Sequence, residues 1–453
     1  MNTGTLVIVF SALCALLVVG KAVRVSVPFL QRLYLPSSVI GGIIGLVVVS
    51  ELGRCIPPES GEIAQKFSMS VAIARQVPGF LINVVFATLF LGFEAPRLRT
   101  VLRLALPQLC VGQLPAWGQY VVGLGLAGFV FVRWFGVPAA FGNLLEIGFE
   151  GGHGTVGGMA ESFKQFNWED GMALGYTMAT TGMIIGIVLG MTMIQWAYRK
   201  GHVSQVVSFQ DRNPNERLGI HPPENRPDAG RQTVMCDSID SLAWHIAITG
   251  VAVLIGYGIR QLIPMKGFPL FPLCMIGGVL LSCAARLLKV DLLIDRGQME
   301  RISGASLDFL VVAAVTTIQL KVVAANWQPL AILVIAGTVW SAWVVLCLAP
   351  RIFHDAWFER AIAEFGQATG VTATGLMLLR TVDPENRTSA AMSFGYKQLL
   401  HEPFMGGGIW TALAFTLVYQ IGWLKVWLFS FAMLALWGVI SFFVARSGGK
   451  KAP

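Results

Sequence analysis

Eleven apolar runs, each long or nearly long enough to cross a lipid bilayer, constrain this sequence more than any other feature. A helix needs about 20 mostly apolar residues to span the hydrocarbon core. Only helices and closed barrels satisfy their backbone polar groups in lipid, and runs of this length indicate helices. We therefore predict an all-α polytopic membrane protein with spans at residues 5–23, 34–50, 78–93, 104–131, 171–197, 242–263, 268–288, 305–320, 328–349, 389–420 and 423–445.

The composition agrees with this class and excludes others. Of the 453 residues, 55% are hydrophobic and only 13% are charged, which is unlike a soluble domain. The seven cysteines are scattered and show no metal-binding spacing. The net charge of +8 is typical of basic cytoplasmic loops in a membrane protein. We therefore expect no nucleic-acid partner and no metal site other than one for sodium.

The distribution of Lys and Arg predicts an orientation. If the N-terminus lies outside and every run crosses once, most of the 33 Lys and Arg fall on the cytoplasmic side. Residues 5–23 follow no basic leader and no cleavage site, which favours a retained helix over a signal peptide. The sequence thus predicts a multi-pass protein of the cell (inner) membrane with a cytoplasmic C-terminus.

A polar, glycine-rich stretch at 150–163, between the fourth and fifth runs, interrupts this pattern. It reads Glu-Gly-Gly-His-Gly-Thr-Val-Gly-Gly-Met-Ala-Glu-Ser-Phe, and a weaker copy of its Glu-x-Gly-x-x-Thr pattern begins at Glu364. Irregular backbone at membrane depth is tolerated only where it is buried in protein or lines a cavity. Two interrupted segments in corresponding places of two halves indicate the binding site of a transporter.

Other short patterns recur in the same order in the two halves. Pro36-x4-Gly-Gly returns as Pro272-x4-Gly-Gly, and Gly175-Tyr returns as Gly395-Tyr. With five spans in each half, the second repeat should be inverted relative to the first. The predicted organisation is a first repeat at 1–200 with a hairpin at 138–167, a cytoplasmic linker at 201–240, a second repeat at 241–422 with a hairpin at 359–386, and an additional helix with a basic tail at 423–453.

The string Gly-Gly-His-Gly-Thr at 151–155, placed before the fifth span of this layout, resembles the bacterial sodium/glutamate symporter family. The resemblance covers roughly residues 5–420. It implies two re-entrant helical hairpins from opposite faces, with tips at 151–155 and 366–372, and a homodimer with a static scaffold and a moving transport unit. It also implies sodium-driven uptake of glutamate. The second motif differs from the family pattern Gly-x-Gly-x-x-x-Pro by lacking the proline and one glycine.

The two tips carry groups suited to an anionic amino acid and a cation. Glycine backbone can unwind and approach a ligand, unwound carbonyls bind sodium, and free N–H groups at a half-helix that begins near Thr155 attract a carboxylate. The predicted substrate-binding residues are Gly151, Gly152, His153, Gly154, Thr155, Gly366, Gln367, Thr369, Gly370, Thr372 and Lys397. The predicted coupling-ion residues are Glu150, Glu364 and Thr374.

Some of these assignments have structural alternatives. The two glutamates could form hydrogen bonds to backbone instead, and His153 could be a packed, neutral imidazole. Lys397, His401 and Glu402 lie at i, i+4 and i+5 of the tenth run, where Pro403 and the glycines at 406–408 should break or bend the helix. The Lys397 ammonium could contact substrate or a coupling site, or it could pair with Glu402 or Glu364.

The predicted function is secondary active transport, namely sodium-coupled symport of glutamate or a related anionic amino acid by alternating access. The alternative is a proton-coupled or sodium-independent carrier of another carboxylate on the same scaffold. A channel would need a continuous polar helix face or rings of like charge. No P-loop, metal motif or nucleophile–base pair occurs. We therefore expect neither an enzyme nor a pump, no catalytic residues, and no cofactor apart from Na+ as the coupling ion.

Overall fold

The computed structural model describes residues 3–33, 35–56, 61–93, 98–203, 214–221, 226–264, 267–384 and 386–448. All regular elements in these ranges are helical. Within them, eight helices are long and apolar enough to cross a membrane, namely Thr3–Ser26, Ser37–Cys55, Glu62–Thr88, Leu104–Trp134, Asp170–Arg199, Ser241–Leu262, Trp327–Ile352 and Trp423–Arg446. The all-α polytopic class predicted from the apolar runs is confirmed.

The bounds of three predicted spans need correction. The helix predicted at 305–320 covers Arg296–Thr316. The third helix begins at Glu62 rather than at residue 78, and Pro78 lies inside it. The run 389–420 is not one helix, because α19 (Ala390–His401) and α20 (Ile409–Gln420) are separate. Proline cannot donate to the helix ladder and the following glycines favour open backbone, so the break falls where Pro403 and its glycines predict it.

The chain forms two compact units, and each draws on both halves of the sequence. Unit 1 comprises Met1–Glu94, His153–Met172 and Asn213–Gln319. Its helices are α1 (Thr3–Ser26), α2 (Pro28–Arg32), α3 (Ser37–Cys55), α4 (Glu62–Thr88), α8 (Gly152–Gly158), α9 (Ala160–Gln165), α11 (Pro214–Leu218), α12 (Ser241–Leu262), α13 (Phe271–Leu287) and α14 (Arg296–Thr316).

Unit 2 comprises Ala95–Gly152, Ala173–Arg212 and Leu320–Pro453. Its helices are α5 (Leu98–Leu126), α6 (Val132–Trp134), α7 (Leu144–Phe149), most of α10 (Asp170–Arg199), α15 (Leu320–Ala325), α16 (Trp327–Trp343), α17 (Ala349–Ile352), α18 (Trp357–Val382), α19, α20 and α21 (Trp423–Gly448). A π-helical turn follows both α5 (η1, Ala127–Phe131) and α16 (η5, Val344–Leu348), and a 3-10 turn (η2, Ala139–Asn143) precedes α7.

Within unit 1, the first glycine of the repeated Pro-x4-Gly-Gly pattern has the same role in both halves. A Cβ added to Gly41 of α3 would lie 2.3 Å from the backbone oxygen of Leu16 in α1. A Cβ added to Gly277 of α13 would lie 2.2 Å from the backbone oxygen of Ala252 in α12. In each half the second span therefore packs on the first at a point where only glycine fits.

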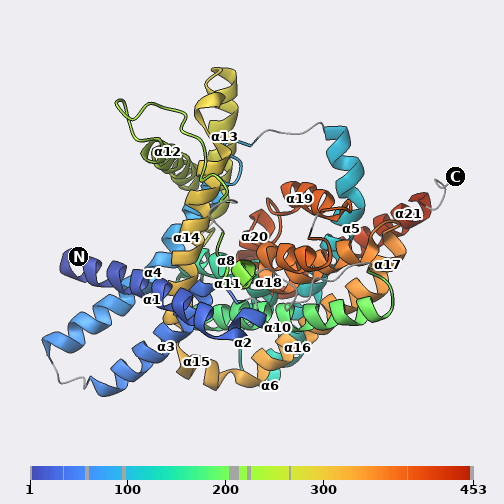
Figure 1. Ribbon diagram of the computed structural model, residues 1–453. Coiled ribbons are helices and arrows are strands. Elements are labelled where there is room, and N and C mark those ends of the chain that lie inside the picture. The colour runs from blue at the N-terminus through green and yellow to red at the C-terminus, as the bar shows by residue number, and fades with distance from the viewer. Residues whose placement is uncertain are drawn as a thin grey trace. The chain divides into compact units, whose positions relative to one another are not determined.

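The second glycine of the pattern contacts a helix from the other half of the sequence. A Cβ on Gly42 would meet Val315 of α14 at 2.6 Å, and one on Gly278 would meet the backbone oxygen of Ala87 in α4 at 2.3 Å. The second span of each half thus packs on the third span of the other half, as Figure 1 shows for the blue and yellow helices of unit 1. These reciprocal contacts are those expected of two related repeats, and the inversion of one repeat relative to the membrane stays a prediction.

In unit 2, a stripe of glycines on α10 brings α18 close. A Cβ on Gly182 would lie 2.4 Å from the backbone oxygen of Thr369, one on Gly186 would lie 2.4 Å from the Thr369 hydroxyl, and one on Gly190 would lie 2.5 Å from Leu378. Small residues at four-residue spacing let helix backbones approach closely in a membrane. Helix α10 therefore supports the middle of α18, where the second motif lies.

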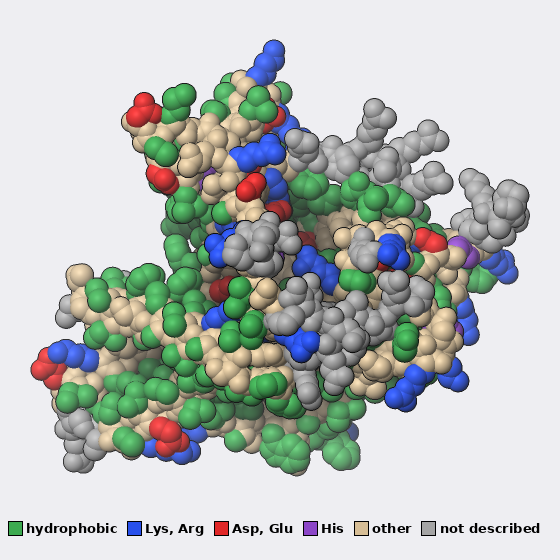
Figure 2. Space-filling model, in the orientation of Figure 1, with side chains coloured by type: hydrophobic (Ala, Val, Ile, Leu, Met, Phe, Trp, Pro, Cys, Tyr) green, Lys and Arg blue, Asp and Glu red, His purple; other side chains and the backbone are tan. Residues whose placement is uncertain are grey.

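The predicted linker at 201–240 contains one short helix, α11, in its described residues. The ammonium of Lys21 donates to the backbone oxygens of Leu218 (2.8 Å) and Gly219 (2.9 Å), so α11 is held against the end of α1. Large apolar side chains are exposed on α1 and on α21, including Phe10, Val18 and Phe443. Figure 2 shows such side chains over much of the visible surface, as expected of helices that face lipid.

Candidate functional site

Helical backbone is interrupted at three places in unit 2, and all three fall on motifs singled out in the sequence. Helix α7 ends at Phe149, directly before Glu150 and the first glycines. Helix α18 contains a kink at Gly370 (φ −154°, ψ 37°) and Val371 (φ 63°, ψ 171°). The third interruption is the segment 402–408 between α19 and α20. A positive φ is costly for a β-branched residue, so the surrounding structure must hold Val371 in place.

The two arms of α18 fold back on each other around this kink. A Cβ on Gly366 would lie 2.6 Å from the Cα of Gly375, so the arms touch through backbone at these two glycines. The tip between the arms contains Thr369, Gly370 and Thr372, inside the range 366–372 predicted for a hairpin tip. Whether this helical hairpin is re-entrant in the bilayer stays a prediction.

The first interruption meets this tip within unit 2. Gly152 has φ +71°, and a Cβ there would lie 2.4 Å from Cγ1 and 3.8 Å from Cβ of Val371. Backbone conformation and the Cγ1 atom of Val371 therefore both favour glycine at position 152. The two interrupted segments that the sequence predicted to share a site are in direct contact.

Glu150 is buried, and its carboxylate contacts His401 of α19. The Oε1 oxygen is paired with His401 Nε2, whereas Oε2 is buried and has no hydrogen-bond partner among the described residues. The first interruption is thereby joined to the helix that precedes the third.

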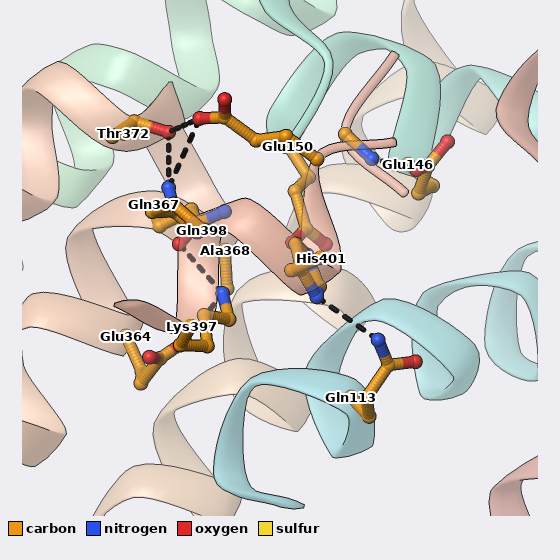
Figure 3. Close-up of polar contacts among 12 residues, drawn as sticks. Gln113, Glu146, Glu150, Glu364, Gln367, Ala368, Thr372, Lys397, Gln398 and His401 are labelled. Carbon is orange, nitrogen blue, oxygen red and sulfur yellow. Dashed lines mark hydrogen bonds and ion pairs between the residues drawn. The ribbon is translucent and has the colours of Figure 1, made fainter. Parts of the chain in front are cut away.

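A chain of hydrogen bonds fixes the tautomer of His401. Trp117 Nε1 can only donate, and it donates to Gln113 Oε1 at 2.8 Å. The other end of that amide, Nε2, therefore donates to His401 Nδ1 at 3.1 Å. Nδ1 is then an acceptor without a proton, and Nε2–H donates to Glu150 (Figure 3). His401 is thus an uncharged imidazole and places no positive charge directly on Glu150.

Glu364 is the counterpart of Glu150 in the second motif, and both of its carboxylate oxygens have partners within the protein. Its Oε2 lies 3.1 Å from the ammonium of Lys397, and its Oε1 accepts from Gln108 Nε2 at 2.7 Å. Lys397 also donates to Gln367 Oε1 at 2.8 Å. A Cβ on Gly112 of α5 would lie 2.4 Å from Lys397 Cε and 2.7 Å from Glu364 Oε2, so a glycine leaves room for the ion pair.

A second basic group lies one turn earlier on α18. Arg360 pairs with Asp355 at 2.7 Å and donates through Nε to Gln108 Oε1 at 2.9 Å. Asp355 lies in the loop before α18 and also accepts from the Ser389 hydroxyl. Burial works against ionisation of Asp355, but the hydrogen bond from Ser389 and the charge of Arg360 outweigh it and lower the pKa of the carboxyl.

At the tip of α18, Thr372 joins two residues of α19. Its hydroxyl donates to Glu402 Oε1 at 2.8 Å and accepts from Gln398 Nε2 at 2.5 Å. Gln398 Nε2 also lies 3.2 Å from Glu402 Oε1, while Gln398 Oε1 is buried without a hydrogen-bond partner in the described part of the chain. The second and third interruptions are therefore linked by a small polar cluster that offers one unused acceptor.

Glu146 is a site residue that the sequence reasoning missed. It lies one turn before Glu150 on α7 and is fully buried. Its carboxylate accepts from Tyr120 (2.6 Å), from the backbone N–H of Gly406 (2.9 Å) and from the hydroxyl of Thr411 (2.7 Å). A carboxylate between the apolar residues Leu145 and Ile147, within the predicted hairpin at 138–167, was itself a usable signal, because such residues are costly in a membrane.

The remaining predicted residues lie as follows. The hydroxyls of Thr369 and Thr374 donate to backbone oxygens of their own helix, at Phe365 and Gly370. The first motif is divided between the two units. Unit 2 contains Glu150, Gly151 and Gly152, and unit 1 contains His153, Gly154 and Thr155, which are buried. The polar network described above consists entirely of unit 2 residues, and Figure 3 shows its core.

The charges of this network favour binding of a cation. Its described residues include five carboxylates and two basic groups. Lys397 pairs with Glu364 and Arg360 pairs with Asp355, and the other carboxylates are Glu146, Glu150 and Glu402. No three His, Cys, Asp or Glu side chains converge as a metal site in the described ranges. A cation would therefore use backbone carbonyl, amide and hydroxyl oxygens together with one carboxylate, which is the ligand set of a hard monovalent ion such as sodium.

Comparison with known proteins identifies the family. The family model described as sodium/glutamate symporter matches residues 3–382, which include both Glu150 and Glu364 and end before Lys397. A search of curated proteins found no match. A match over most of the chain, together with the membrane-spanning helices, makes the protein a transporter of the symporter type. The chain belongs to the sodium/glutamate symporter family.

Proposed function

We propose that this protein carries glutamate, or a closely related anionic amino acid, across the cell membrane together with sodium, and that both bind at the three interruptions of unit 2. Family membership supports sodium-coupled glutamate transport over the proton-coupled alternative. The location of the site and the identity of its ligands are the proposal.

The observation that carries this proposal is the meeting of the three interruptions in one unit. Gly152 packs on Val371, Glu150 pairs with His401, and Thr372 donates to Glu402. Unwound backbone at membrane depth exposes carbonyls and N–H groups that regular helices would satisfy internally. Convergence of such segments gathers backbone polar groups at one buried polar centre, which suits an ion and a charged solute.

We assign the coupling ion to Glu150. Its Oε2 is buried and has no donor among the described residues, and the imidazole on its Oε1 carries no charge. A bound sodium ion would balance this carboxylate, with help from carbonyls of Gly151 and Gly152. A buried carboxylate with no cation in direct contact is costly, so the ion should stabilise the folded protein.

We assign the substrate to the tip of α18. The second arm of α18 starts at the tip, so its first N–H groups and the positive end of its dipole favour a carboxylate of the substrate. Glu402 lies beside Thr372 and can accept the substrate's ammonium. Gln398 Oε1 is another acceptor nearby, and this oxygen has no hydrogen-bond partner in the described residues. Gly366, Gln367 and Gly370 shape this pocket rather than supply charge.

Alternating access would follow from movement of one unit relative to the other. Both units contain helices from both halves of the chain, as expected if one is a scaffold and the other carries the substrate. A homodimer, an outside N-terminus and a cytoplasmic linker and C-terminus complete the proposed arrangement. The distribution of Lys and Arg supports this orientation.

Uptake by purified protein in liposomes tests the proposal. Labelled L-glutamate should accumulate under an inward sodium gradient and should not accumulate when choline replaces sodium. A Glu150→Gln variant should lose most of the sodium dependence, whereas Glu161→Gln, an exposed glutamate of the same glycine-rich stretch, should behave as wild type. Accumulation driven by a proton gradient without sodium would refute the coupling ion, and no accumulation under either gradient would refute the substrate.

A further inference from the structure

The matching carboxylates Glu150 and Glu364 are balanced in different ways by residues of one helix. Lys397 and His401 lie four residues apart on α19, so their side chains leave the same face. Lys397 Nζ pairs with Glu364, and His401 Nε2 pairs with Glu150 (Figure 3). Helix α19 therefore delivers an ammonium to one copy of the Glu-x-Gly-x-x-Thr motif and an uncharged imidazole to the other.

We propose that the ammonium of Lys397 is a built-in cation that occupies, at Glu364, the position an exchangeable cation would otherwise fill. This inference rests on the proposed function, because it assigns the exchangeable sodium to only one of the two matching carboxylates. Glu150 is then the carboxylate whose counter-ion binds and leaves during transport. The charge of Glu364 is balanced by the chain itself, and Glu364 is not a sodium ligand.

The contacts of the two carboxylates support this division. Both oxygens of Glu364 have protein partners, since Oε1 accepts from Gln108 at 2.7 Å and Oε2 faces Lys397 at 3.1 Å. The ammonium has a further acceptor in Gln367, at 2.8 Å. At Glu150, by contrast, Oε2 is buried without a hydrogen-bond partner in the described part of the chain.

The fit of the ion pair also supports a built-in cation. Lys397 and Glu364 have side-chain exposures of 0% and 2%, so water does not screen their charges. Gly112 clears the space that Lys397 Cε and Nζ occupy, because a Cβ there would lie 2.4 and 2.8 Å from these atoms. Removing one partner of such a pair leaves a buried, uncompensated charge, which is strongly destabilising. The folded protein should then gain stability by binding a cation from solution.

Sodium dependence of thermal unfolding tests the inference on purified protein. The variants are Lys397→Met, Glu364→Gln, the double variant of both, and Lys425→Met as a matched control at an exposed lysine. Unfolding midpoints are measured across sodium concentrations, with choline keeping ionic strength constant. The steepness of the response reports how many sodium ions the folded state binds relative to the unfolded state.

The inference predicts that the folded Lys397→Met variant binds one more sodium ion than the folded wild type. This variant should unfold at lower temperature in choline and should respond to sodium more steeply than wild type. The double variant should return to the wild-type steepness because no unpaired charge remains. Glu364→Gln should be destabilised without a steeper sodium response, and Lys425→Met should match wild type.

Three results would overturn the inference: a wild-type sodium response in Lys397→Met, an additional sodium ion that persists in the double variant, or a Lys397→Met protein that cannot be recovered folded in either salt. Recovery of folded Lys397→Met in sodium but not in choline would support it. The test is independent of the transport assay. If wild-type protein shows no sodium-driven glutamate uptake, the proposed function fails, and the unfolding data still decide the role of Lys397.

Discussion

Replacing Gly182 with alanine should perturb two interruptions of unit 2 at once. A Cβ at this position would lie 2.4 Å from the backbone oxygen of Thr369 and 2.6 Å from the ring of Phe149. An ordinary carbon contact is about 3.5 Å, so the tip of α18 or the end of α7 must move by roughly 1 Å. Rotation of a side chain cannot relieve a clash with backbone. Overpacking of this kind costs about 1–3 kcal/mol.

The matched control is Gly438→Ala on α21, where an added Cβ meets nothing within 4 Å. Both substitutions gain the same helix propensity, about 1 kcal/mol, so the difference between the two variants isolates the clash. If the strain falls on the substrate-bound state, 1–3 kcal/mol corresponds to about a 5–150-fold loss of glutamate affinity. The assays are thermal unfolding in detergent and glutamate binding. Equal stability and affinity in the two variants would refute the packing described for α10.

Two further predictions concern single polar contacts. Thr372→Val removes the hydroxyl that links Glu402 to the tip of α18. It should raise the KM for glutamate about tenfold, which corresponds to about 1.4 kcal/mol and lies within the range of a typical hydrogen bond. The control Thr192→Val, at an exposed residue of α10 whose hydroxyl bonds within that helix, should leave KM unchanged. Asp355→Asn should destabilise the protein at neutral pH. Because the folded-state pKa of Asp355 lies below its ordinary value, its contribution is complete above the unfolded-state pKa of about 3.9 and is lost as the pH falls through the folded pKa. Unfolding midpoints of wild type and variant should therefore converge in acid, and a constant difference would contradict this role.

Local patterns in the sequence were sufficient to predict where helices form and break. Long apolar runs predict helices in lipid, and glycine or proline clusters predict their interruptions. The kink at Gly370 and Val371 falls inside the predicted tip, and the break between α19 and α20 falls at Pro403. These features depend on residues close in sequence, so they can be recognised without the fold.

Which polar side chains pair with one another could not be predicted in the same way. The sequence left Lys397 free to pair with Glu402 or Glu364, and the structure shows Glu364 because α5 offers an open position at Gly112. Glu146 was missed although it lies one turn before Glu150, since its donors come from α5 and from the segment around Gly406 and α20. Contacts of this kind join residues from 26 to 265 positions apart, and no periodicity encodes them.

Disulfide formation between the two tips tests most directly whether the interrupted segments meet. The variant carries Gly152→Cys and Val371→Cys in a background that lacks the seven native cysteines. The Cβ positions are 3.8 Å apart, a typical separation for a disulfide. With a protease site placed in the linker at 201–240, the cleaved halves should stay joined after oxidation in membranes and separate on reduction, while either single variant should give separate halves. Halves of the double variant that separate under oxidising conditions, in protein that is otherwise folded, would contradict the shared site.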